Sequence, residues 1–255
     1  LRRADVVMLG NSRTQRAFST EATADFFRGI GASFYVAGFG YGENVTFAQA
    51  LFEKLEPRPR AVIVNADPFF DADVSWPART LLKTENGEGV YGDKEAWQAV
   101  HREVCGGDAG LEWLCGDAPA IFRSVTDGRW HLVDHGAPAA IPISRDPEDP
   151  SGVRPAAERE RWAERARRFL GVLADSGVPR DCVLFTVVPS DFTTYAAARD
   201  LARRFGIEVV TADLAGLATT DGSHLTRPSA ERWSAALLER AERRLNDCIA
   251  GPGLS

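Results

Sequence analysis

The stretch Val6-Val7-Met8-Leu9-Gly10-Asn11-Ser12 sets the organisation of this chain. Its apolar run has the length of a buried parallel strand, and it stops at Gly-Asn-Ser, residues that favour a tight turn. A serine is therefore presented at the carboxyl end of the first strand. Ligands bind at this edge of open α/β sheets, because loops and helix N-termini converge there. Ser12 is either a turn residue or a nucleophile, depending on which side chains reach it.

Strands and helices alternate along most of the chain. Further apolar or β-branched segments at 33–37, 60–67, 182–189 and 207–210 are typical of strands, and helical periodicity covers 20–29, 44–55, 156–176, 193–205 and 228–246. Strands that alternate with helices imply right-handed crossovers and a parallel sheet. We therefore expect a three-layer α/β/α fold with a parallel sheet of about five strands.

Residues 71–155 interrupt this alternation after the third strand. The stretch is rich in Gly and Pro and carries Trp76, Trp97, Trp113 and Trp130. Long, weakly regular insertions are usually functional or mobile. We expect an irregular cap that faces substrate, with helices at 94–104 and 119–126, within a single domain that spans residues 1–255.

Composition and charge narrow the class of protein. The 255 residues are 44% hydrophobic and 26% charged, as in soluble globular proteins. A net charge of -6 gives no reason to expect nucleic acid as a partner. No apolar run reaches the ~18 residues needed to cross a bilayer. Because the chain begins at Leu1 rather than Met, a signal peptide or membrane anchor could precede it.

The chain contains four cysteines, and their spacing matches no zinc-binding pattern. Cys105 and Cys115 bracket a Gly-rich segment that a disulfide could clamp. Cys182 opens a strand and Cys248 closes the last helix, so a second bridge is open to them; the alternative is four free thiols. Disulfides persist only in oxidising compartments, so we expect an extracytoplasmic location, periplasmic or secreted.

A second polar segment, Asp221-Gly222-Ser223-His224, follows the fifth strand and precedes the last helix. An Asp three residues before a His can accept a hydrogen bond from one ring nitrogen, which leaves the other nitrogen to take a proton from a serine. A hydroxyl is a poor nucleophile until a base removes its proton. Ser12, His224 and Asp221 can supply nucleophile, base and orienting carboxylate, because all three follow strands of one parallel sheet.

Gly10-Asn11-Ser12 and Asp221-x-x-His224 together resemble the first and last motif blocks of the SGNH hydrolases, also called GDSL-like esterases. The resemblance covers residues 4–70 and 155–247. It implies the flavodoxin-like SGNH hydrolase fold, with Ser12, His224 and Asp221 as the catalytic triad.

The oxyanion hole follows from the same resemblance. Gly42, in Gly-Glu-Asn after the second strand, matches the family's oxyanion-hole glycine, and Gly40 is the alternative register. The family typically ends its third strand in Gly-x-Asn-Asp, whereas this chain has Val64-Asn65-Ala66-Asp67. Asn65 is the candidate asparagine, and the backbone N–H of Ser12 completes the set. If Asn65 lies too early on the strand, the third donor is missing or replaced.

The resemblance predicts a serine esterase that forms an acyl-enzyme on Ser12. Tryptophans in the insertion suit stacking on sugar rings, so we expect the substrate to carry O-acyl groups, in particular O-acetyl groups, on a carbohydrate or cell-envelope glycan. One alternative is an O-acyltransferase acting on an envelope polysaccharide, with a membrane partner that supplies the acyl group. The other is an inactive member of the fold that binds glycan or a protein partner. The hydrolysis needs no metal or cofactor, and we expect none.

Overall fold

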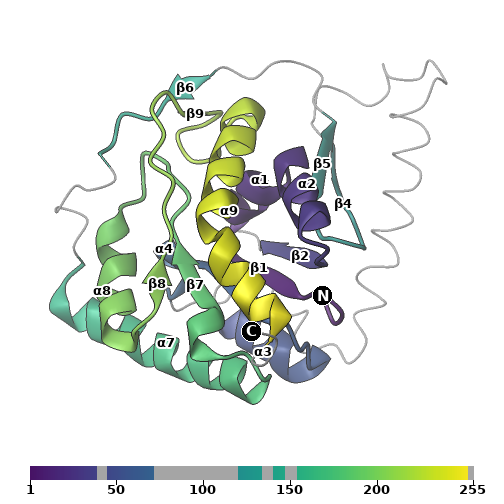
Figure 1. Cartoon of the computed structure of the whole chain (residues 1–255). Coiled ribbons are helices and arrows are strands. Elements are labelled where there is room, and N and C mark those ends of the chain that lie inside the picture. Colours follow the sequence, from purple (N-terminus) through teal and green to yellow (C-terminus); the bar gives the residue numbers. More distant parts are fainter. Residues whose placement is uncertain (39–44, 72–119, 134–139, 147–153, 252–255) are drawn as a thin grey trace.

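The computed structural model describes residues 1–38, 45–71, 120–133, 140–146 and 154–251 of the chain. Its centre is a five-stranded parallel sheet in the spatial order β2-β1-β3-β7-β8 (Figure 1). The strands are β1 (Val6–Gly10), β2 (Phe34–Gly38), β3 (Ala61–Asn65), β7 (Val183–Thr186) and β8 (Glu208–Val209). The predicted α/β fold with five parallel strands is confirmed.

Helices flank this sheet in two groups. α1 (Ser12–Phe18) and α2 (Glu21–Gly29) pack against α9 (Arg227–Ala250), while α7 (Ala156–Asp175) packs against α3 (Val45–Leu55) and α8 (Tyr195–Phe205) (Figure 1). The chain reverses direction across the sheet after β2, so right-handed crossovers place α3, α7 and α8 on the face opposite α1 and α2. A short helix, α4 (Ala66–Phe69), follows β3, and a 3-10 turn, η3 (Arg180–Cys182), precedes β7.

The core lies where these helices meet the sheet. All residues of β1 and β3 are buried, which agrees with the unpatterned apolar runs of strands covered on both faces. On one side the ring of Trp233 of α9 meets Phe18 of α1 edge to face, with 5.4 Å between ring centroids. On the other side α7 buries the apolar stripe that its sequence predicts, which comprises Trp162, Ala166, Phe169, Leu170 and Leu173.

Part of the segment after β3 forms a hairpin rather than a helix. β4 (Ala120–Arg123) and β5 (Trp130–Val133) pair antiparallel, so the predicted helix at 119–126 is wrong. The turn between them is closed by a bond from Ser124 N–H to the Arg129 carbonyl and passes through Gly128 at φ +72°. Glycine accepts this left-handed conformation without strain, which favours a reversal of the chain here.

Two further short strands, β6 (Ile141–Pro142) and β9 (Ala218–Thr219), pair antiparallel near the start of α9. Residues 72–119, 134–139 and 147–153 of the predicted insertion, which include the helix at 94–104 and the pair Cys105 and Cys115, lie outside the described residues.

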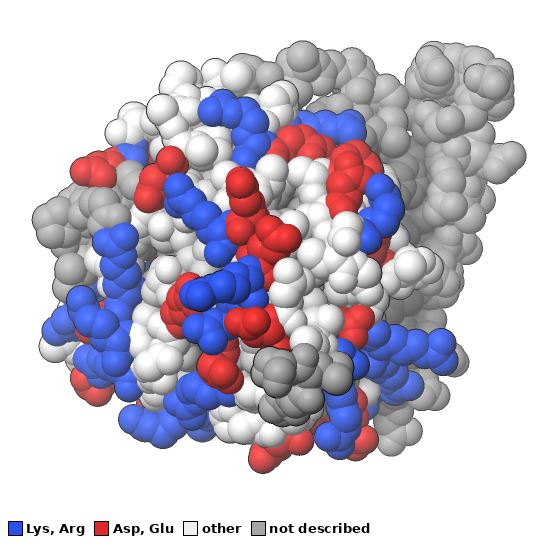
Figure 2. Space-filling model, viewed as in Figure 1, with Lys and Arg blue, Asp and Glu red and all other residues white. Residues whose placement is uncertain are grey.

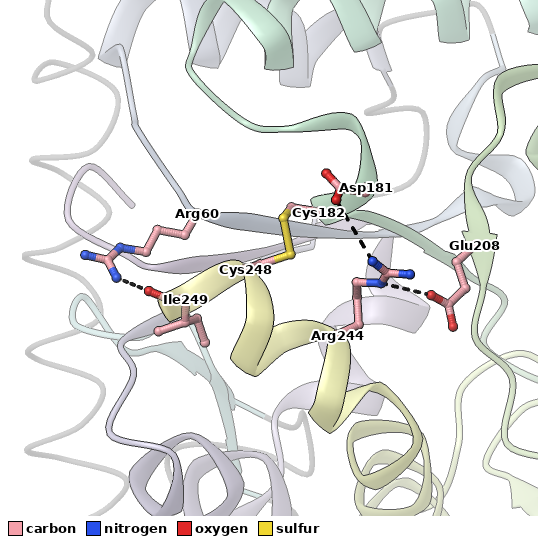
Figure 3. The surroundings of a disulfide bond; sticks show 7 residues. All are labelled: Arg60, Asp181, Cys182, Glu208, Arg244, Cys248 and Ile249. Atoms are coloured by element: carbon pink, nitrogen blue, oxygen red, sulfur yellow. Dashed lines mark hydrogen bonds and ion pairs between the residues drawn. A yellow bond between two sulfur atoms is a disulfide. The ribbon is translucent and has the colours of Figure 1, made fainter. Parts of the chain in front are cut away.

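A disulfide joins Cys182 to Cys248 and ties the start of β7 to the end of α9 (Figure 3). This pair therefore forms the bridge that was one of the alternatives for it. Arg60 donates to the carbonyl of Ile249 beside it, and Arg244 reaches Glu208 at 3.3 Å. The bridge lies at the amino end of β7, away from the carboxyl ends of the strands.

Basic and acidic side chains are interspersed on the face of the molecule that α9 crosses. Figure 2 shows blue and red groups side by side over this face, without a broad region of one sign among the described residues. Such a surface is typical of a solvated protein face rather than of a polyanion-binding stripe.

Candidate active site

Ser12 is the first residue of α1, immediately after β1. Asn11 caps the helix: its side-chain oxygen accepts the N–H of Arg13 at 3.1 Å. The sequence pattern predicts a helix only from residue 20, so α1 was missed. Asn11 is the local signal for this helix, but Gly-Asn-Ser favours a tight turn as well.

Two glycines let α1 lie close to the sheet. A Cβ on Gly10 would fall 1.9 Å from the Thr14 hydroxyl, and one on Gly38 would fall 2.5 Å from the Cβ of Gln15. Any larger residue at either strand end would push α1 outward. The close approach sets the position of Ser12 over the carboxyl end of β1.

The segment between β9 and α9 carries Asp221 and His224. Oδ1 of Asp221 accepts the backbone N–H groups of Ser223 and His224 at 2.9 and 2.7 Å, while Oδ2 contacts Nδ1 of His224 at 2.7 Å. We call residues Thr220–Leu225 the catalytic loop. A hydrogen bond from the Thr220 N–H to the His224 carbonyl joins the two ends of this loop. One carboxylate therefore shapes the loop and orients the imidazole.

The electrostatics of Asp221 follow from these contacts. Partial burial raises the pKa of the carboxyl, but hydrogen bonds from the His224 ring and from the backbone N–H groups of His224 and Ser223 outweigh it. The pKa of Asp221 therefore lies below its ordinary value. At neutral pH the group is an anion that can hold Nδ1–H of His224 and stabilise an imidazolium.

The other ring nitrogen of His224 meets the serine. Nε2 lies 2.8 Å from Oγ of Ser12, within hydrogen-bond distance. The structure thus brings together all three residues that the sequence assigns to a triad, with the base between the hydroxyl and the carboxylate. This is the geometry that lets an imidazole take a proton from a serine and return it to a leaving group.

Asn65 ends β3 next to the nucleophile turn. Its side-chain oxygen accepts the Val188 N–H at 3.0 Å, and its amide nitrogen faces the side-chain oxygen of Asn11 at 3.4 Å. The side chain is 1% exposed, so these contacts hold its orientation. The donor end of Asn65 therefore points to the turn that carries Ser12. Gly42 and its alternative Gly40 lie outside the described residues.

A bond that sequence reasoning missed joins the nucleophile helix to the catalytic loop. Nε of Arg13 donates to Oγ of Ser223 at 2.9 Å. Arg13 follows the nucleophile directly, and Ser223 precedes the base directly. The contact therefore fixes the two halves of the triad relative to each other, and no local pattern in either segment indicates it.

Asp67 lies near the same edge but forms a separate ion pair. Oδ1 contacts Nη2 of Arg154 at 3.1 Å, and Oδ2 accepts the Thr194 N–H at 3.4 Å. Burial raises the pKa of Asp67 above its ordinary value, although the charge of Arg154 opposes the shift. The guanidinium of Arg154 also covers the Trp162 ring at 3.9 Å. Asp67 therefore anchors the segment before α8 and is not a triad member.

The segment after β7 also supports the catalytic loop. The Asp191 N–H donates to the Gly222 carbonyl at 3.0 Å, and Oδ1 of Asp191 accepts the N–H and hydroxyl of Ser144 at 2.9 and 3.0 Å. Phe192 lies against Gly222, yet its side chain is 63% exposed. Three segments are thus tied together at the rim of the site, with an aromatic ring left in solvent.

No cluster of three or more His, Cys, Asp or Glu side chains in the described ranges is arranged to hold a metal ion. None of the helices described there combines the length and the apolar character needed to span a bilayer.

Three comparisons with known proteins found no protein similar to this chain. A scan of protein-family models, a search of curated proteins and a search of solved structures each returned no match to this chain. Its functional interpretation therefore rests on the geometry of Ser12, His224 and Asp221.

Proposed function

We propose that this protein is a serine esterase of the SGNH type that removes O-acyl groups, in particular O-acetyl groups, from a carbohydrate or cell-envelope glycan. The observation that carries the proposal is the continuous contact from Asp221 through His224 to Ser12, at 2.7 and 2.8 Å. The strand order β2-β1-β3-β7-β8 supports it, since this is the 2-1-3-4-5 order of flavodoxin-like sheets.

Acylation begins when Oγ of Ser12 attacks the ester carbonyl carbon. As the carbon–oxygen bond forms, the hydroxyl proton moves to Nε2 of His224, and the ionised Asp221 stabilises the resulting imidazolium through Nδ1–H. The carbonyl electron pair moves onto oxygen. When the tetrahedral intermediate collapses, the bond to the leaving alcohol breaks, and that alcohol takes the proton from Nε2.

Deacylation repeats these steps with water. His224 removes a proton from water, the new oxygen bonds to the acyl carbon, and the bond to Ser12 breaks as its Oγ recovers the proton. The products are the free acid, the sugar alcohol and the unmodified enzyme. If a sugar hydroxyl replaces water in this step, the same triad performs O-acyl transfer.

The oxyanion needs donors aimed at the carbonyl oxygen. We assign this role to the backbone N–H groups of Ser12 and Gly42 and to the amide of Asn65. Its fixed orientation toward Asn11 supports Asn65, because a donor that does not reorient gains most in a water-poor site. One such donor is typically worth about 2.7–4 kcal/mol in the transition state.

The test is reaction of the folded protein with a fluorophosphonate, followed by intact-mass analysis and peptide mapping. We expect one adduct, on Ser12, and none in Ser12→Ala or after unfolding. Acetate release from a chromogenic acetyl ester should follow the same pattern. Absence of both adduct and acetate release from the folded wild type would reject the enzyme and favour the inactive glycan-binding or partner-binding alternative.

A second experiment distinguishes esterase activity from acyltransferase activity. Sugar acceptors are added to the chromogenic ester assay, and the products are analysed by mass spectrometry. Free acetate as the main product supports the esterase. Acetylated sugar formed at the expense of acetate would instead identify an O-acyltransferase, the function that would call for a membrane partner as acyl supplier.

A further inference from the structure

A cavity of about 390 Å³ lies beside the catalytic loop, on the side of α2 and β5. Its walls come from α1, the start of α2, the β4–β5 hairpin and the first turn of α9. The volume falls within the range of about 300–1,000 Å³ that is usual for small-molecule pockets. None of the three triad residues is among its lining residues.

The cavity shares its walls with the elements that carry the triad. Arg16 lies one helical turn after Ser12 on α1 and lines the cavity. Thr220 and Leu225 begin and end the catalytic loop and also line the cavity. A molecule bound here therefore rests against the supports of both nucleophile and base.

The lining is partly aromatic and partly charged. Trp130 contributes an indole ring, and its backbone N–H donates to the Ser19 hydroxyl at 2.7 Å, which fixes this end of β5 against the segment before α2. A pyranose ring has an apolar face of C–H groups and hydroxyls at its edge. Such a ring can pack on the indole while its hydroxyls reach the polar walls.

Three arginines line the cavity, and two of them, Arg129 and Arg227, have different surroundings. Two carboxylates balance the charge of Arg129, because its guanidinium contacts Asp127 at 3.0 Å and Glu21 at 3.2 Å. Arg227, the first residue of α9, is exposed and has no ion pair within the residues that the structure describes. It can therefore offer its charge to a ligand, and Arg pairs well with a carboxylate because its planar fork donates two parallel bonds.

We propose that this cavity is a subsite for an acidic saccharide, with Trp130 under a sugar ring and Arg227 on the sugar carboxylate. This inference rests on the proposed function and specifies its glycan as one that contains uronic acid. An acyl chain fits less well, because it would cover Arg129, Glu21 and Arg227 without offering hydrogen bonds, and buried polar groups without partners are costly.

The test uses Ser12→Ala, which binds without turning over. Isothermal titration is performed with oligouronates of different linkage and with the same oligosaccharides after chemical reduction of their carboxyl groups to alcohols. We expect at least one oligouronate to bind, and its reduced counterpart to bind at least 10-fold more weakly. If no oligouronate binds, or if reduced and acidic forms bind equally, the inference is wrong.

Variants locate the binding. In the Ser12→Ala background, Arg227→Gln should weaken binding of the oligouronate at least 10-fold and leave binding of the reduced form nearly unchanged. Trp130→Ala should weaken both, and Trp130→Phe should restore part of the loss. Arg168→Gln, on the exposed face of α7, is the matched control, and this variant should bind the oligouronate as tightly as Ser12→Ala alone. Equal binding by all variants would place the ligand elsewhere and overturn the inference.

The two proposals can fail separately. Oligouronate binding that depends on Arg227 and Trp130, together with no ester turnover by wild type, would support the subsite and reject the esterase. Ester turnover without oligouronate binding would support the esterase and reject the subsite. A melting curve for each variant identifies any that does not fold.

Discussion

Nε2 of His224 lies 2.8 Å from Oγ of Ser12, although 212 positions separate the two residues in the chain. The contact exists because β1 lies inside the sheet, between β2 and β3, and the chain returns to the carboxyl edge of the sheet after β9. The first residue of α1 presents the hydroxyl, the N-cap Asn11 holds the start of that helix, and Asp221 orients the His224 ring. Each of these supports can be removed by a single substitution.

Asp221→Asn should reduce kcat for a chromogenic ester about 10⁴-fold, because an amide no longer selects the correct tautomer of His224 or stabilises its charged form. The measurement is steady-state kinetics at pH 7 with titration of active sites by a fluorophosphonate. Asp213→Asn, which changes a carboxylate hydrogen-bonded to Tyr195, is the matched control and should retain activity. A wild-type rate in Asp221→Asn would contradict the triad.

The same variant gives a prediction for stability against pH. The folded-state pKa of Asp221 is lowered, so its contribution to stability is fully present above the unfolded pKa of about 3.9 and is lost as pH falls through the folded value. The difference in melting temperature between wild type and Asp221→Asn should therefore be largest near neutral pH and vanish in strong acid. Thermal melts from pH 7 to pH 2 measure it. A difference in melting temperature that grows as pH falls would contradict this prediction.

The substitution Asn65→Asp, at the end of β3, tests the amide donor of Asn65 while it keeps the side-chain oxygen that accepts a hydrogen bond. An aspartate keeps an oxygen for the Val188 N–H but removes the amide donor that faces Asn11. Loss of one oxyanion donor should lower kcat about 10²–10³-fold. Steady-state kinetics with a neutral ester measure the effect, and KM should change little. A kcat within 2-fold of wild type in a folded variant would remove Asn65 from the oxyanion hole.

The bond between Arg13 and Ser223 should appear as coupling between two substitutions. Arg13→Gln and Ser223→Ala each remove the same contact, so the double variant should lose little more kcat than the worse single variant. Arg13→Lys should recover part of the activity if a donor to Ser223 is what matters. A kinetic double-mutant cycle measures the coupling. Additive losses would show that the bond does not position the catalytic loop.

Removing the disulfide should affect stability and not chemistry. The double variant Cys182→Ala, Cys248→Ala opens a link between positions 66 residues apart and should lower the free energy of unfolding by about 2–5 kcal/mol. Denaturant unfolding measures the loss, and kcat for a small ester should stay near wild type because the bridge lies away from the triad. An unchanged midpoint, or a large loss of kcat in folded protein, would contradict this assignment.

Local patterns in the chain determined much of the fold. The five strands and most long helices follow from apolar runs and helical periodicity, signals that span fewer than about 20 residues and depend on neighbouring side chains. The same is true of the Asp221-to-His224 motif, whose internal hydrogen bonds lie within four residues. The wrong predictions are also local: Asn11, the N-cap of α1, equally favours a turn, and residues 119–126 are predicted as a helix although Gly128, just after them, reverses the chain.

Only the tertiary structure decided which distant groups meet. The tertiary fold places Ser12 beside His224 and Arg13 beside Ser223, and it pairs Asp67 with Arg154. It also brings Trp130 and Arg227 to the walls of one cavity. These contacts join segments that are 87 to 212 residues apart. Their formation depends on packing of the whole sheet and its helices, so no stretch of the chain carries the information by itself.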